Sequence, residues 1–251
     1  MSVKFAVQVL LDVDWADLEY RGPNQISHLD ETWVRGRMGM FEKLTLPSLL
    51  QQDFQAFDIM LLCGTEYTSI TESHEWHPRI KLFYDLGESF VTGQKADHFV
   101  VTRIDSDDLY HRHAMDEVRN NLILSDKREC LMFRRHYLWD MMNKFINLRR
   151  RHSPAFFTHI FPRKLYRNWP EYRKQHYVVH IEAGGKLRTT KELKDHMACV
   201  TRHSGNHQYR RLHQDVRNYL SKEGLEMKSK EFGFVNDRKK MVFRKRSRGT
   251  K

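Results

Sequence analysis

Apolar and polar positions along the first half of the chain form alternating blocks that predict strands and helices in turn. Four short, mostly apolar runs are typical of buried strands: Val3–Leu11, Phe57–Cys63, Arg79–Tyr84 and His98–Ile104. Apolar residues recur at helical spacing over Gly36–Gln52, where Pro47 should kink the helix or begin a new turn, and over His111–Leu124. This order favours an α/β fold with a mostly parallel central sheet flanked by helices.

The second half of the chain has a less regular pattern. The expected strands and one aromatic segment are Cys130–Phe133, Ala155–Phe161 (aromatic), Tyr177–Ile181 and Met197–Thr201. The expected helical segments are Trp139–Arg151, a turn at Lys191–His196, and His207–Leu220. The sequence contains no internal repeat and no low-complexity linker. We therefore predict one domain of about residues 1–220, followed by a basic extension over 221–251.

Positive charge is concentrated in two segments. The net charge is +11, and Arg149–Lys174 and Asp237–Lys251 each hold eight Lys or Arg residues against one acid, which gives +7 apiece. The other 210 residues therefore carry −3. Basic patches attract nucleic acid, anionic membranes or phosphorylated substrates, although a basic terminus is also typical of a solvated tail. Because the chain lacks a zinc-finger spacing and an RNP-like motif, nucleic acid is not an expected partner.

Three further features limit the class of protein. No apolar run approaches the roughly 18 residues that a membrane span requires. The apolar start, Met1–Leu11, is typical of a first strand rather than of a signal peptide. Cys63, Cys130 and Cys199 are widely spaced in apolar stretches, which predicts buried free thiols in a reducing compartment. We therefore expect a cytoplasmic protein.

An acidic cluster, Asp105-Ser106-Asp107-Asp108, follows the fourth predicted strand. Three carboxylates within four residues repel one another, and a divalent cation relieves that repulsion. Mg²⁺ and Mn²⁺ prefer such oxygen ligands together with phosphate and water. The alternative is that Asp107 or Asp108 caps the helix predicted from His111. The position directly after a buried strand favours the metal site.

Other polar groups follow the other predicted strands. Asp12 and Asp14 come after the first strand, Gly64 after the second, and Asp85 after the third. The carboxyl ends of parallel strands meet at one edge of a sheet, where α/β proteins bind their ligands. These groups and the acidic cluster therefore predict a nucleotide site at that edge.

Three motifs in the same chain order resemble the glycosyltransferase A-type (GT-A) fold, and within it the bacterial putative rhamnosyltransferase family. They are the LPSL…Q…F helix preceded by Arg35-x-Arg37, the strand-to-loop motif TRIDSDD, and Val200–Asn206 after a late strand. The resemblance covers about residues 30–210 and implies a donor half of about 1–125 and an acceptor half of about 126–220. The chain departs from the family at residues 10–25 (LLDVDWADLEYRGPNQ) and at Ser204, where the family has glycine.

The resemblance implies donor-binding roles for the acidic cluster. Asp105 and Asp107 would occupy the two acidic positions of a DxD motif, near ribose and metal, with Asp107 the better metal ligand. Asp108 would be a third ligand or a donor-sugar contact. Arg103 would contact donor phosphate, or brace the loop through a salt bridge with Asp105. A Mn²⁺ or Mg²⁺ ion would bridge the donor diphosphate.

Roles are also implied for four more distant residues. Asp85 matches a position that holds the nucleotide base, with an ordinary surface aspartate as the alternative. His203 matches a metal ligand or a diphosphate contact. An inverting transferase needs a carboxylate to deprotonate the acceptor hydroxyl, and Asp140 and Glu182 are the candidates. A retaining transferase needs no such base, and both residues would then be structural.

Aromatic residues interleave with the basic charges of Arg149–Lys174: Phe156, Phe157, Tyr166, Trp169 and Tyr172. Such residues stack on sugar rings, and the neighbouring cations would suit an anionic acceptor. The same pattern suits single-stranded nucleic acid. It is equally typical of an ordinary surface helix with part-buried aromatic side chains.

These features predict an enzyme of the glycosyltransferase class. It would move a sugar from a nucleotide-diphosphate donor to a saccharide or other hydroxyl acceptor, with Mn²⁺ or Mg²⁺ as cofactor. The alternative is a nucleic-acid-binding or nuclease-like protein, whose acidic cluster holds metal and whose basic patches hold phosphate. A non-catalytic binding module is a third hypothesis. No residue indicates the sugar, the nucleotide, the acceptor or the stereochemical outcome.

Overall fold

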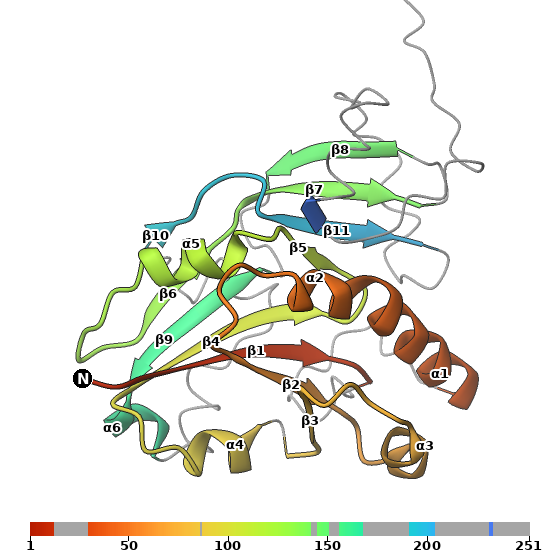
Figure 1. Ribbon diagram of the computed structural model, residues 1–251, viewed down its shortest axis with the longest axis horizontal. Coiled ribbons are helices and arrows are strands. Elements are labelled where there is room, and N and C mark those ends of the chain that lie inside the picture. Colours follow the sequence, from red (N-terminus) through yellow and green to blue (C-terminus); the bar gives the residue numbers. More distant parts are fainter. Residues whose placement is uncertain are drawn as a thin grey trace, which may run out of the picture.

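The computed structural model describes residues 1–12, 30–85, 87–141, 145–150, 156–167, 191–203 and 231–232. The described residues form two sheets, one of seven strands and one of four, with helices against the larger sheet (Figure 1). Among these residues, no helix is long and apolar enough to cross a membrane. Cys63, Cys130 and Cys199 are buried free thiols, as the sequence predicts.

The larger sheet has the order β10-β6-β9-β4-β1-β2-β3. Its strands are β1 (Val3–Leu10), β2 (Asp58–Leu62), β3 (Ile80–Phe83), β4 (His98–Asp105), β6 (Glu129–Met132), β9 (Phe157–Pro162) and β10 (Lys191–Glu192). All of these pair in parallel except β9, which runs antiparallel to both of its neighbours. The prediction of an α/β fold with a mostly parallel central sheet is confirmed.

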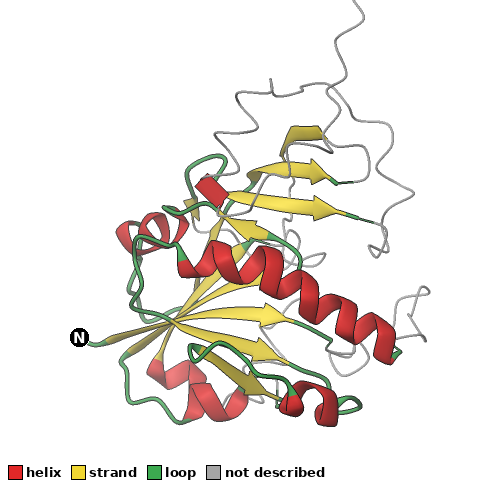
Figure 2. Cartoon of the chain, turned by 45° about the vertical axis from the view of Figure 1, so that its right-hand side comes forward, coloured by secondary structure: helices red, strands yellow, loops and turns green. Residues whose placement is uncertain are grey.

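Successive side chains of β1 point to opposite faces of this sheet, and a hydrophobic cluster packs on each face. Phe5, Val7 and Val9 join a cluster with side chains of α1 (Glu31–Met40), α2 (Leu46–Leu50) and α5 (Ala114–Asn120). Ala6 and Leu10 point to the other face, where they pack with α4 (Glu88–Thr92) and α6 (Arg163–Tyr166). Helices therefore flank the sheet, and α3 (Thr68–Ser73) packs at its edge (Figure 2).

The first helix is longer than the sequence predicts and changes its winding before the proline. It begins at Glu31, where the Asp30 carboxylate caps the Trp33 N–H at 2.7 Å. A π-helical turn, η2 (Phe41–Thr45), leads directly into α2, which carries Pro47 in its first turn. Proline cannot donate a helical hydrogen bond, so its place at the start of a new segment is the favourable one.

The smaller sheet has the order β5-β11-β7-β8, with β5 (Leu109–Tyr110), β7 (Arg135–Asp140), β8 (Phe145–Arg150) and β11 (Ala198–Arg202). The helix predicted over Trp139–Arg151 is wrong, because β7 and β8 pair antiparallel through this region. Its apolar residues do recur at three- and four-residue spacing. Cross-strand pairs such as Trp139 with Ile146 use the same residues in a sheet.

Other elements of the second half have mixed outcomes. Strands are confirmed at β6 and β11, and the aromatic segment is β9. The helical turn predicted at Lys191–His196 is wrong: β10 pairs there with β6, and His196 takes a left-handed conformation with φ 67°. The elements predicted at Tyr177–Ile181 and His207–Leu220 lie outside the described residues.

The aromatic residues of the basic stretch do not form an open platform where the structure describes them. Phe156, Phe157 and Tyr166 are each at most 2% exposed and pack in the core of the protein. Trp169 and Tyr172 lie outside the described residues. Three of the five rings are thus accounted for by core packing, which corrects the prediction that they stack on a ligand.

Candidate active site

The acidic cluster lies where the strand order of the larger sheet reverses. From β1 the sheet continues through β2 to β3 on one side, and β4 lies on the other side. The register pairs Leu10 with both Asp105 and Leu62, so the carboxyl ends of β4, β1 and β2 lie side by side. Open α/β sheets bind ligands outside the carboxyl ends of their strands at such a reversal. The fold therefore places the acidic cluster at the expected binding edge.

Asp107 is the centre of this cluster. Its carboxylate is buried, with a side chain 6% exposed, and it contacts two basic residues from distant parts of the chain. Arg37 of α1 contacts it with both terminal nitrogens, Nη1 at 2.6 Å from Oδ2 and Nη2 at 3.3 Å from Oδ1. His203, directly after β11, places Nε2 2.8 Å from Oδ2. Two cationic or hydrogen-bonding groups therefore hold one carboxylate from opposite ends of the sequence.

The backbone of the acidic cluster is held by two threonines. Thr201 of β11 donates its hydroxyl to the Asp107 carbonyl at 2.6 Å and its N–H to the Asp108 carboxylate at 2.9 Å. Thr45 of η2 donates its hydroxyl to the Asp108 carbonyl at 2.8 Å. These three hydrogen bonds satisfy both carbonyl groups and one carboxylate oxygen of the loop, which helps it to keep its conformation.

Asp105 has a different environment from Asp107. It ends β4 with a side chain 28% exposed, and it accepts a hydrogen bond from Arg103 Nη2 at 2.7 Å. Arg103 is itself buried, with its guanidinium 5.6 Å from the Phe157 ring centre. The bracing contact proposed for Arg103 is therefore present. Contact between Arg103 and donor phosphate stays a prediction.

The two buried carboxylates of the cluster have pKa values displaced in opposite directions. Burial alone would raise the pKa of Asp107, but the charges and hydrogen bonds of Arg37 and His203 outweigh it and lower that pKa well below its usual range. Burial raises the pKa of Asp108 well above its usual range, and the charges of Asp107 and Asp105 raise it further. Asp107 is therefore the carboxylate built to stay ionised.

A further buried carboxylate lies at the end of β1. Asp12 is 4% exposed, and its Oδ1 accepts the Gly64 N–H at 2.8 Å at the end of β2. Its Oδ2 is buried and accepts no hydrogen bond from the part of the chain that the structure describes. Burial raises the pKa of Asp12, although the bond from Gly64 opposes this. A side chain at position 64 would bring its Cβ within 2.8 Å of the Asp12 carbonyl, so glycine permits this approach.

The remaining candidate residues have other hydrogen-bond partners or lie outside the described residues. Asp85 is exposed, and its two carboxylate oxygens accept N–H groups of Gly87 and Ser89 at the start of α4, at 3.0 and 2.8 Å. This accounts for Asp85 as a helix-capping residue, and its role at the nucleotide base stays a prediction. Glu182 lies outside the described residues.

Asp140 ends β7 with no exposed surface. Its Oδ2 lies 3.0 Å from Nη1 of Arg202, which is 2% exposed on the neighbouring strand β11. A carboxylate enclosed in a buried ion pair cannot reach an acceptor hydroxyl in this arrangement, so the geometry favours the structural alternative for Asp140. Its role as catalytic base stays an untested prediction.

A bound Mn²⁺ or Mg²⁺ ion fits part of this arrangement. Asp107 Oδ2 and His203 Nε2 lie 2.8 Å apart, a spacing that two ligands of one ion adopt, and the carboxylate is a donor that suits Mn²⁺ and Mg²⁺. Arg37 occupies the same carboxylate, and Asp105 is engaged by Arg103. An ion would therefore use Asp107 and His203 in place of Arg37. Asp105 does not form a three-donor group with them at metal-ligand spacing, and its role as a ligand stays a prediction.

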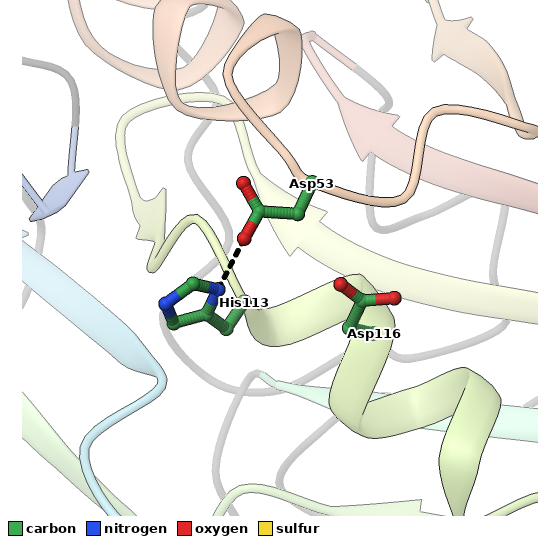
Figure 3. A group of neighbouring side chains, drawn as sticks. All are labelled: Asp53, His113 and Asp116. Atoms are coloured by element: carbon green, nitrogen blue, oxygen red, sulfur yellow. Dashed lines mark ion pairs between the residues drawn. The ribbon is translucent and has the colours of Figure 1, made fainter.

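In the described part of the chain, the one group of three side chains with metal-ligand spacing lies elsewhere. Donor atoms of Asp53, His113 and Asp116 all lie within 4.8 Å of one another (Figure 3). Asp53 and His113 form an ion pair, and Arg112 Nη2 lies 2.7 Å from Asp53 Oδ1. Arg119 pairs with Asp116 at 2.7 Å. Because each carboxylate already has a basic partner at the surface, ion pairing explains this group without a metal.

Comparison with known proteins gives no family. No family model matches the sequence, and no curated protein matches it. Among solved structures, the chain is similar to TarS of S. aureus at 14% identity and a TM-score of 0.41, covering 79% of this chain and 36% of that chain. It thus spans about a third of the length of that protein.

Two further solved structures are similar at comparable levels. A putative glucose-1-phosphate thymidylyltransferase from Bacillus anthracis has 16% identity and a TM-score of 0.36, covering 85% of this chain and 97% of that one. A 4-diphosphocytidyl-2C-methyl-D-erythritol synthase has 11% identity and a TM-score of 0.37, covering 82% and 92%. With TM-scores this low, none of these likenesses supports an inference about the site or its activity.

Proposed function

We propose that this protein is a metal-dependent glycosyltransferase that moves a sugar from a nucleotide-diphosphate donor to a hydroxyl acceptor. The observation that carries the proposal is Asp107: a buried, ionised carboxylate at the carboxyl edge of the sheet, at the reversal of strand order, held by Arg37 and His203. That edge is where α/β sheets bind nucleotides. The TRIDSDD motif, which the family resemblance identifies as its DxD element, supplies the same residues.

The residues of the site have distinct roles in the proposed reaction. Asp107 and His203, with Asp105, would hold a Mn²⁺ or Mg²⁺ ion, which when bound supplies positive charge to the departing diphosphate. Arg37 adds a second positive group beside Asp107, in a partly buried setting where charges interact more strongly than in water. Thr45 and Thr201 keep the acidic loop in place. Among the described residues, no exposed carboxylate is identified as the catalytic base.

A screen for donor binding tests this proposal directly. Nucleoside diphosphates of uridine, guanosine and thymidine should raise the melting temperature in the presence of Mn²⁺ and not in its absence. A ligand at 100 times its Kd adds about 2.7 kcal/mol of stability, which is several degrees for a chain of this size. Tight, steeply salt-dependent binding of oligonucleotides without nucleoside-diphosphate stabilisation would instead support the nuclease-like alternative.

Asp107→Asn is the sharpest single variant. The asparagine keeps the size of the side chain but removes the charge, so metal-dependent donor binding and sugar transfer should both fall by at least about 100-fold. The substitution leaves Arg37 without its partner, which costs about 3–5 kcal/mol, so the assay is run well below the melting temperature of the variant. Asp116→Asn, at a surface carboxylate paired with Arg119, is the matched control. Full activity in Asp107→Asn would contradict the proposal.

A further inference from the structure

Arg37 makes a contact that competes with the proposed function of Asp107. Its guanidinium faces the carboxylate with two nitrogens, at 2.6 Å from Oδ2 and 3.3 Å from Oδ1. Planar pairing of this kind is a strong and geometrically defined arrangement. The Arg37 side chain is only 14% exposed, so solvent screens the pair weakly. In this arrangement Asp107 already has a cation, and a metal ion would meet that positive charge.

The guanidinium of Arg37 also has an unused donor. Its Nε is buried and donates no hydrogen bond to any of the described residues. The centre of the Trp33 ring lies 5.4 Å from the guanidinium carbon. A buried N–H without an acceptor is uncommon and costs free energy. An oxygen atom of a ligand that reached this N–H would supply the acceptor that it lacks.

The geometry points to an exchange of partners at Arg37. Without a donor, Arg37 neutralises Asp107. When the nucleotide-diphosphate donor and its metal ion bind, Asp107 passes to the ion and the guanidinium passes to the diphosphate oxygens. Charge is balanced in both states. The metal ion would neutralise Asp107 in place of Arg37, and Arg37 would pair with the negatively charged diphosphate. This inference rests on the proposed function, and it assigns Arg37 as the residue that recognises the diphosphate.

Mn²⁺ binding to the donor-free protein separates this exchange from a structural role. Arg37→Met removes the competing charge, so Mn²⁺ should bind about tenfold more tightly in the absence of nucleotide. The same variant should bind a nucleoside diphosphate with Mn²⁺ about tenfold more weakly and the uncharged nucleoside equally well. Calorimetry measures all three affinities. Arg35→Met is the matched control, because Arg35 lies on the same helix, is 59% exposed and pairs with Glu31.

A second variant keeps the test decisive if Arg37→Met folds poorly. Arg37→Lys keeps the charge and loses the planar fork, so it should retain weak Mn²⁺ binding while losing affinity for the diphosphate. Unchanged or weaker Mn²⁺ binding in Arg37→Met, with diphosphate binding intact, would overturn the exchange and leave the proposed function standing. If the wild-type protein binds no nucleoside diphosphate at all, the proposed function fails, and the diphosphate role of Arg37 fails with it.

Discussion

Asp107 and Asp108 are neighbours in the chain, equally buried, and electrostatically opposite. Asp107 faces two basic groups, so its pKa is lowered despite burial. Such a carboxylate contributes stability above its unfolded pKa, and that contribution is lost as the pH falls through the folded value. Burial and the charges of Asp107 and Asp105 raise the pKa of Asp108, although the N–H bond that it accepts from Thr201 opposes this. Its contribution has the reverse sign: it is full below the unfolded pKa and is lost as the pH rises through the folded one.

The sign for Asp108 gives a prediction for Asp108→Asn. Asparagine retains an oxygen for the Thr201 N–H and cannot ionise, so the variant escapes the loss of stability that wild type incurs as the pH rises. The melting temperatures of the two proteins should agree near pH 3 and diverge at higher pH. At pH 8 the variant should melt about 2–4 °C higher, the shift that ~1 kcal/mol produces in a domain of this size. Thermal melts across this range would contradict the reasoning if the variant melted lower at pH 8.

At the scale of elements, β11 connects the acidic loop to the smaller sheet. Thr201 and His203 point to one side and contact Asp107, whereas Arg202 points to the other side and pairs with Asp140. This is the two-residue alternation of an extended strand. One strand end thus organises the candidate metal ligand on one face and a buried ion pair on the other.

Thr201→Val tests how much the acidic loop depends on β11. Valine has the same shape but no hydroxyl, so the Asp107 carbonyl loses the 2.6 Å hydrogen bond that Thr201 donates. Leaving a buried acceptor without a partner costs about 1–3 kcal/mol. Denaturant unfolding should show this loss, while Thr201→Ser, which keeps the hydroxyl, should lose less. Equal losses in the two variants would show that packing of the methyl group, and not the hydrogen bond, is responsible.

The elements and the site differ in how far the sequence predicts them. The strands around β1, β2 and β4 are continuous apolar runs, so local pattern suffices. The helix prediction over Trp139–Arg151 is wrong because pairing between strands decides the structure of β7 and β8. A single sequence does not reveal which strands pair. The acidic cluster is visible as a motif. Its contacts with Arg37 and Thr201, 70 and 94 residues away, are tertiary. Arg37 is part of the Arg35-x-Arg37 motif, which was the available signal for it.

At the scale of the whole molecule, the acidic cluster is the segment in which the chain passes from the larger sheet to the smaller one. Asp105 ends β4 of the larger sheet, and Leu109 begins β5 of the smaller one. The candidate site therefore lies where the sheets meet, and residues from both contribute to it. Phe232, from far along the chain, packs beside the smaller sheet, where its ring contacts those of His111 and Tyr137.

Phe232→Ala tests whether the C-terminal region belongs to this unit. Phe232 is 1% exposed, and the preceding Glu231 carbonyl accepts the Arg112 N–H at 3.0 Å. Removing a buried phenylalanine side chain costs about 3–5 kcal/mol. Chemical unfolding should show this loss in one cooperative transition. A loss below about 1 kcal/mol would indicate that residues 221–251 are an appendage, as the sequence predicts.

The long separations across the acidic cluster also set an order of events during synthesis. His203 follows Asp107 by 96 residues, which corresponds to about 5–20 s at ordinary translation rates. Arg37 precedes Asp107 by 70 residues, so it has already been synthesised when that interval begins. The growing chain can therefore neutralise the Asp107 carboxylate with Arg37 well before β11 exists. In a nascent chain, Arg37 is therefore the first residue able to pair with Asp107, and it is also the residue that we propose leaves Asp107 when the ligand binds.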